Sequence, residues 1–318
     1  MPKNNELQSA LDKVITRYGD RTVDYLEGIA IRREIIYDDY IETDALLSLQ
    51  HPLTDYHDEL TFLIYHQQTE LWFRLALHEM EAGIEALLKS PSNIAKGIQA
   101  ASRTNRILKF LTDSFDVLID GLDTDEFLEF RKAFGSSSGF QSAQFRAIEI
   151  VAGLERKPKG TDKSFYWEQA ARSIGTGEPT LTLIKFKEKH LHWLNDMYEK
   201  REPYSFRMAF QKAAQGASKE TDLQRLYHSV IAGECGIELK TLAEELLKLD
   251  LSIINWKISH LRAAAKHMTK VPRGTGDTNW AEYLSKSIQE EHYFPELVKA
   301  KQELVAEEEV EYETLGDA

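Results

Sequence analysis

The sequence predicts an all-α protein, and three observations support this fold class. Long stretches are rich in Ala, Leu, Glu, Lys and Gln, which favour helices. The 318 residues include only 17 glycines and 8 prolines, the residues that most often interrupt helices. Apolar residues, 42% of the chain, recur at three- and four-residue steps. Because no internal repeat is visible, we expect one helical bundle in a single domain spanning residues 1–318.

The longest predicted helix runs from about Asp55 to Lys89, a stretch with no proline and a single glycine, Gly83. Two neighbouring stripes run along it. One comprises Leu60, Leu63, Ile64, Leu71, Leu75 and Leu88, and the other comprises Phe62, His66, Phe73 and Leu77. Apolar surface on more than one side indicates a central helix. Ser90-Pro91 ends it, because proline disfavours helical backbone in the residue before it.

The other elements follow in order along the chain. A second helix is predicted from about Ile94 to Ile119, and a third begins after the turn at 121–125, with Thr124 or Asp125 as its N-cap. The small-residue loop 135–139 lets the backbone pass close to a flat group, before another helix near Gln141.

The second half of the chain contains two further helical patterns. They cover about 180–199 and 223–267, the latter punctuated at Gly233 and Gly236. The segment 271–278 cannot be regular helix. Residues 157–222 are predicted to form a small accessory helical insertion, and residues 1–45 an N-terminal arm.

Composition excludes several functional classes. The formal charge of −13 disfavours nucleic acid and anionic membranes as partners. No apolar stretch has the length of a signal peptide core or a membrane span, so a cytoplasmic location is expected. The single cysteine, Cys235, excludes an intrachain disulfide and a multi-cysteine metal site. Any metal would need nitrogen or oxygen ligands.

Two histidines on predicted helices are candidate site residues. His66 lies one turn after Phe62, and His260 lies one turn before Ala263 and Ala264, where small side chains would admit a planar macrocycle. A helical imidazole is a common ligand of haem iron. Arg262 and Lys266, one turn apart, could meet its propionates. Considered alone, each histidine is more simply a core or surface residue.

Arg131 and Thr275 are further candidates. Arg131 lies one turn after Phe127 and just before the loop 135–139, where its guanidinium could hold a carboxylate through two hydrogen bonds. Thr275 lies between two glycines and suits a lid as well as an ordinary connection. A solvated arginine and a plain loop are the simpler interpretations of these two features in isolation.

Five sequence blocks, taken together, resemble the tryptophan 2,3-dioxygenase family. They are YDDYIETDALLSLQHPL (37–53), HDELTFLIYHQQTELWFRLALHE (57–79), FRKAFGSSSGFQSAQFRAIE (130–149), WKISHLRAAAKHMTKVPRGTG (256–276) and YLSKSIQEEHYFPEL (283–297). The blocks occur in family order and span most of the chain. The patterns HQxxELWF and SGFQSxQFRxxE are specific enough that chance is a poor explanation of the resemblance.

The resemblance implies an all-α helical bundle of the tryptophan/indoleamine 2,3-dioxygenase type, usually a homotetramer, that holds haem b. It implies that O2 is a co-substrate and that the C2–C3 bond of the indole ring of L-tryptophan is cleaved to give N-formyl-L-kynurenine. It further implies that the N-terminal arm of each subunit contacts a neighbouring subunit.

The resemblance also implies roles for individual residues. By position, His260 matches the axial ligand of the haem iron, and His66 matches the catalytic histidine that accepts a hydrogen bond from the indole N–H. The remaining matches are substrate-binding residues: Phe62 over the ring, Arg131 on the carboxylate, Thr275 near the ammonium, Phe127 beside the carboxylate, and Tyr37, Tyr40 and Ile41 from the neighbouring subunit.

The chain departs from the family pattern at several positions. Asp277 follows Gly276 where a second glycine is usual, and the loop before Thr275 is one residue longer. Tyr65 replaces a small or amide side chain, and Phe127 replaces a tyrosine found in many bacterial members. These departures keep open a relative that uses a modified tryptophan or inserts a single oxygen atom. A non-catalytic haem or amino-acid sensor and a cofactor-free scaffold are the remaining alternatives.

Overall fold

The predicted all-α fold class is confirmed by a computed structural model, which describes residues 4–31, 36–156, 165–173, 175–269, 271, 274, 279–289 and 292–316. Over these ranges every regular element is a helix, and one isolated bridge joins Arg172 to Pro179. Contacts divide the chain into two compact units, Met1–His51 and Pro52–Ala318. Nowhere in the described ranges is there a helix with the length and apolarity needed to cross a membrane.

The N-terminal unit contains short helices with almost no core of their own. They are α1 (Asn4–Tyr18), η1 (Gly19–Arg21), α2 (Thr22–Ile31), α3 (Tyr37–Ile41) and α4 (Thr43–Leu47). Among its described residues only Thr22 is buried, while Val23, Ile29 and Ile31 are exposed. This unit therefore presents an apolar surface that its own helices leave uncovered.

The second unit contains the remaining helices. They are α5 (His57–Leu88), α6 (Ile94–Asp113), α7 (Asp116–Ile119), α8 (Thr124–Phe130), η2 (Arg131–Phe134), η3 (Gly139–Gln141), α9 (Ala143–Ala152), α10 (Tyr166–Ala170), α11 (Leu181–Glu199), α12 (Arg201–Tyr204), α13 (Phe206–Ala217), α14 (Leu223–Ala232), α15 (Ile237–Met268), α16 (Trp280–Gln289) and α17 (Pro295–Gly316).

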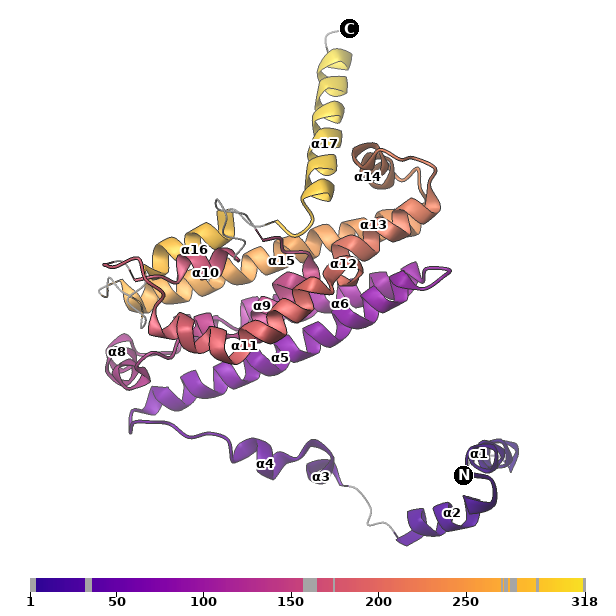
Figure 1. Cartoon of the computed structure of the whole chain (residues 1–318), viewed down its shortest axis with the longest axis horizontal. Helices are drawn as coiled ribbons and strands as arrows, with labels where there is room; N and C mark the ends of the chain where they lie inside the picture. The colour runs from indigo at the N-terminus through magenta and orange to yellow at the C-terminus, as the bar shows by residue number, and fades with distance from the viewer. Residues whose placement is uncertain are drawn as a thin grey trace. The chain divides into compact units, whose positions relative to one another are not determined.

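Three long helices form the centre of this second unit (Figure 1). The helix α6 packs against both α5 and α15, while α9 and α13 cover α5. The helix predicted over residues 55–89 is confirmed as α5. Its core face carries Phe73, Leu77 and Met80, all nearly inaccessible, whereas Leu60 and Leu71 of the first apolar stripe remain exposed. The prediction of apolar surface on two sides is thus correct.

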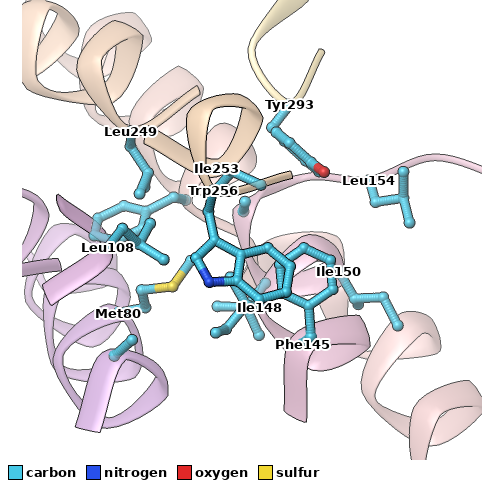
Figure 2. Packing of buried hydrophobic residues seen from close by; sticks show 14 of the residues in the cluster. Met80, Leu108, Phe145, Ile148, Ile150, Leu154, Leu249, Ile253, Trp256 and Tyr293 are labelled. Atoms are coloured by element: carbon cyan, nitrogen blue, oxygen red, sulfur yellow. The ribbon is translucent and has the colours of Figure 1, made fainter. Parts of the chain in front are cut away.

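Side chains from α5, α6, α9 and α15 meet around one tryptophan of the core (Figure 2). Trp256 packs against Phe145 with ring centroids 4.4 Å apart, and Phe73 meets its edge at 5.3 Å. Met80 and Leu108 line the same region. A large ring buried among four helices fixes the register of α15 against the others, because interior packing leaves little room for displacement.

Two predicted boundaries differ from the structure. The helix predicted from Ile94 to Ile119 breaks after Asp113, where the Ser114 hydroxyl donates to the Leu111 carbonyl at 2.8 Å and competes with the helical backbone bonds. The cap of α8 is Asp123, not Thr124 or Asp125. Its carboxylate accepts the amides of Asp125 and Glu126 at 2.9 and 3.0 Å.

The segment predicted as an accessory insertion provides helices α10 to α13 within the described residues. Phe186, Phe206 and Phe210 of this segment are buried in the same core as α5. The helix α13 packs directly on α5. Phe206 of α13 lies so close to Gly83 of α5 that a Cβ atom added to Gly83 would be 2.7 Å from the Phe206 ring. These helices therefore complete the core of the second unit.

Candidate active site

His66 lies in the third turn of α5 with one ring nitrogen bonded to its own helix. Its Nδ1 is 2.7 Å from the carbonyl oxygen of Phe62. A carbonyl only accepts, so Nδ1 carries the proton. Burial lowers the pKa of His66, partly offset by the Phe62 carbonyl and by Glu70. The neutral ring therefore leaves Nε2 as a hydrogen-bond acceptor.

His260 lies near the end of α15, beside Trp256 and Phe115. The ring centroids are 5.4 Å from Trp256 and 6.0 Å from Phe115. Burial, with smaller electrostatic contributions from His66 and Arg146, lowers the pKa of His260 to about 4. The imidazole is consequently neutral near pH 7, the form that ligates metals. The Phe115 ring also lies 5.7 Å from the ring of Tyr65, the residue before His66, so ring contacts through Phe115 and Tyr65 link the two histidines.

An aromatic wall, defined here as Phe62, Phe127, Phe130 and Phe134, adjoins His66. The Phe62 ring lies 4.0 Å from His66, and 5.8, 5.7 and 5.4 Å from Phe127, Phe130 and Phe134. Three of these rings come from α8 and η2, and Phe62 comes from α5. The wall gives His66 an apolar surround suited to a flat aromatic group.

Arg131 directly follows α8, between the wall residues Phe130 and Phe134. Its side chain is half-buried, and burial lowers its pKa. Among the described residues it makes no hydrogen bond or ion pair. A partly buried guanidinium without a protein partner retains its five donors for an external anion. Arg131 is thus a half-buried cation in the same segment that carries Phe130 and Phe134.

The small-residue loop after Arg131 is tied to α11. The Thr182 hydroxyl donates to the Ser136 carbonyl at 2.8 Å, and the Gln141 side chain donates to the Thr182 carbonyl at 3.2 Å. Within the loop Gln141 accepts from the Ser138 amide. Gly135 has a φ of +58°, which favours glycine. The loop is therefore held by a helix of the predicted insertion.

Of the predicted site residues, the structure places Phe62 in ring contact with His66 and Phe127, while Arg131 follows directly after α8 and His260 is linked to His66 through Phe115 and Tyr65. Thr275 lies outside the described residues, as does Asp277. Three more belong to the N-terminal unit, so their part in the site stays a prediction; these are Tyr37, Tyr40 and Ile41, all exposed. Arg262 and Lys266 are also exposed on α15.

A buried ionic cluster was not predicted from the sequence. Glu149 is fully buried and pairs with Lys257 at 2.8 Å and Arg146 at 2.9 Å. It also accepts the hydroxyls of Tyr166 and Tyr293, both at 2.8 Å. Burial would raise the pKa of Glu149, but Lys257 and Arg146 lower it to about 2. Glu149 therefore stays ionised between two buried cations.

Unpaired buried donors mark the same region. Arg146 Nε and Trp256 Nε1 are both buried, yet neither has a hydrogen-bond partner within the part of the chain that the structure describes. Such donors are costly unless an acceptor meets them. Arg146 lies 5.4 Å from the Phe145 ring, against which Trp256 also packs. The sequence signal for Trp256 is its position one turn before His260, and the signal for Arg146 is its place as a fixed residue of the pattern SGFQSxQFRxxE.

These features define an all-helical protein whose site combines two neutral histidines from distant helices, an aromatic wall and an unpaired arginine. The family model described as Tryptophan 2,3-dioxygenase matches residues 29–230, more than half of the chain. The chain belongs to the tryptophan 2,3-dioxygenase family and is an enzyme of that kind.

Bacterial relatives extend the similarity beyond that match. The chain is 32% identical over 277 residues to a tryptophan 2,3-dioxygenase of Bradyrhizobium diazoefficiens, covering 85% of this chain and 92% of the relative. A Ruegeria sp. protein of the same name is 33% identical, covering 82% and 90%. One from Bacillus thuringiensis is 28% identical, covering 92% of this chain and 99% of its own.

Proposed function

We propose that the chain is a haem-dependent dioxygenase that cleaves the indole C2–C3 bond of L-tryptophan with O2 to give N-formyl-L-kynurenine. The observation that carries this proposal is the chain of ring contacts from His66 through Tyr65 and Phe115 to His260, with both imidazoles held neutral by burial. The names of the relatives support the reaction type.

The residues around His260 fit a haem group. His260 is a neutral imidazole on a long helix, and within the described residues it makes no protein hydrogen bond, so either nitrogen is free to ligate iron. The donors Arg146 Nε and Trp256 Nε1, which have no partner among the described residues, suit a carboxylate such as a haem propionate. When bound, haem b supplies the iron that activates O2.

The aromatic wall and its neighbours then bind and orient the substrate. Arg131 donates two hydrogen bonds to the tryptophan carboxylate, and the aromatic wall packs on the indole ring and excludes water. His66 Nε2 accepts the indole N–H, because its Nδ1 proton is already bonded to Phe62. We further propose that Thr275 contacts the substrate ammonium.

We also propose a homotetramer in which the N-terminal unit completes a neighbouring site. The exposed fractions of Tyr37 and Tyr40 in this unit are 74% and 78%, and Ile41 is exposed as well. Large apolar side chains left uncovered by their own unit favour burial against another protein surface. The family resemblance of the segment 37–53 supports a second copy of this chain as that surface.

The decisive experiment measures the product formed from L-tryptophan and O2 by the haem-loaded, reduced protein. We expect a product heavier by two oxygen atoms with an opened ring. Addition of one oxygen atom would instead support the monooxygenating alternative, and bound haem without turnover would support the sensor.

The ligand assignment has its own variant. His260→Ala is expected to lose the haem absorbance band, whereas His78→Ala, at an exposed position on α5, should retain it. Full haem occupancy and normal turnover in His260→Ala would overturn the assignment.

A further inference from the structure

A third histidine, His267, is buried two turns beyond His260 on the same helix. Its exposed fraction is 4%. Its Nε2 lies 2.8 Å from the Leu118 carbonyl of α7, and its Nδ1 lies 3.0 Å from the Thr124 hydroxyl at the start of α8. The ring therefore bridges α15 to two short helices at once.

The two contacts fix the ring in one orientation. The Leu118 carbonyl can only accept, so Nε2 carries a proton. In the neutral ring Nδ1 is then an acceptor, and the Thr124 hydroxyl donates to it. A flipped ring would place carbon atoms against both partners and leave the buried carbonyl unpaired, at a cost in free energy.

The contact between His267 and α8 is important because α8 carries Phe127 and leads directly into Arg131. Thr124 is the first residue of α8, and one turn later the Phe127 ring lies 5.3 Å from His267. Phe127 in turn lies 5.8 Å from Phe62 in the aromatic wall. Arg131 follows at the end of α8. A helix of seven residues has little stability of its own, so tertiary contacts decide where it lies.

We propose that His267 is a positioning residue that couples α15, which carries His260, to α8, which carries Phe127 and leads into Arg131. It does not touch the substrate, and the proposal rests on the proposed function for the meaning of that geometry. Through His267 the iron-side helix and the carboxylate-binding segment are held in one register, as productive orientation of a substrate requires.

The test compares variants that break each contact. Thr124→Val removes the hydroxyl while keeping the shape of the side chain, and His267→Leu removes both bonds. We expect KM for L-tryptophan to rise about tenfold in each, corresponding to roughly 1.4 kcal/mol, with the haem absorbance of the wild type. His267→Gln, which keeps one donor and one acceptor, should restore most of the affinity.

The matched control is Thr104→Val. The Thr104 hydroxyl is also buried, and it bonds to Ala100 within α6, remote from the aromatic wall. This variant loses a buried hydroxyl and should lower stability without changing KM. Amide hydrogen exchange over residues 124–130 gives a readout independent of activity, and it should quicken in Thr124→Val but not in Thr104→Val.

The outcomes separate the two proposals. Unchanged KM and unchanged exchange in both Thr124→Val and His267→Leu would overturn the positioning role, even if the wild type cleaves tryptophan. A wild type that forms no product would overturn the proposed function. If the wild type forms no product, faster amide exchange of α8 in Thr124→Val but not in Thr104→Val would still support the coupling of α8 to α15. Equal exchange of α8 in these two variants would refute the coupling.

Discussion

Replacing Glu149 with glutamine should destabilise the protein strongly, because its carboxylate lies between two buried cations. Glu149→Gln keeps the size of the side chain but removes the negative charge that pairs with Lys257 and Arg146. Removing one partner of a buried ion pair costs about 3–5 kcal/mol. The linkage between pKa and stability gives a similar magnitude: a carboxyl whose pKa falls from 4.5 to about 2 contributes about 3 kcal/mol.

The pH dependence supplies a second measurement on the same variant. The folded-state pKa of Glu149 is depressed, so its contribution is present above pH 4.5 and is lost as the pH falls toward 2. Urea unfolding followed by helical circular dichroism at neutral and acidic pH would show this. The wild type should lose stability across that window, and Glu149→Gln should lose less.

Glu129→Gln is the matched control. Glu129 pairs with Lys132 at 2.6 Å on the surface, with about half of its side chain exposed. An exposed pair of this kind contributes less than about 1 kcal/mol. If Glu149→Gln unfolds at the same urea concentration as Glu129→Gln, the reasoning about the buried cluster is wrong.

Three further predictions concern the site. Arg131→Leu should raise KM for L-tryptophan about tenfold to hundredfold, since hydrogen bonds to a charged group are worth roughly 1.5–3 kcal/mol. Lys132→Leu is the control. An unchanged KM in Arg131→Leu would contradict the proposed binding of the substrate carboxylate by Arg131. Thr182→Val leaves the Ser136 carbonyl without its hydroxyl donor, so proteolytic cleavage at 135–139 should accelerate. Thr241→Val is the control and should show no such change, because the Thr241 hydroxyl donates to the Ile237 carbonyl within α15. Because burial lowers the pKa of His66 below 6.5, kcat/KM should show no loss attributable to its protonation between pH 6.5 and 8; a step in that interval that disappears in His66→Ala would refute this.

The long helices could be predicted because their cause is local. The absence of proline over 55–89 and the spacing of apolar residues predict α5 to within two residues at its start and one at its end. The break between α6 and α7 could not be predicted in this way, because it depends on a serine hydroxyl competing for a carbonyl.

The site residues also differ in whether the sequence or only the packing of helices reveals them. His66, Arg131 and His260 were identified through the family resemblance, since each alone has a simpler interpretation as a structural residue. Phe130 and Phe134 join the aromatic wall only because α8 and η2 pack against α5. Arg146 and Glu149, three residues apart on a helix, have the spacing of an ordinary surface pair, and only the covering helices bury them.

The 32-residue helices α5 and α15 are long enough that much of the core along them lies far from the candidate site residues His66 and His260. His66 lies near the beginning of α5, and Leu87, at its far end, is about 30 Å away along the axis at 1.5 Å per residue. Changes that distant are usually additive with changes at a site. Thermostabilising substitutions around Leu87 could therefore be accumulated without altering turnover, so that robustness and catalytic rate can be optimised in independent rounds of engineering.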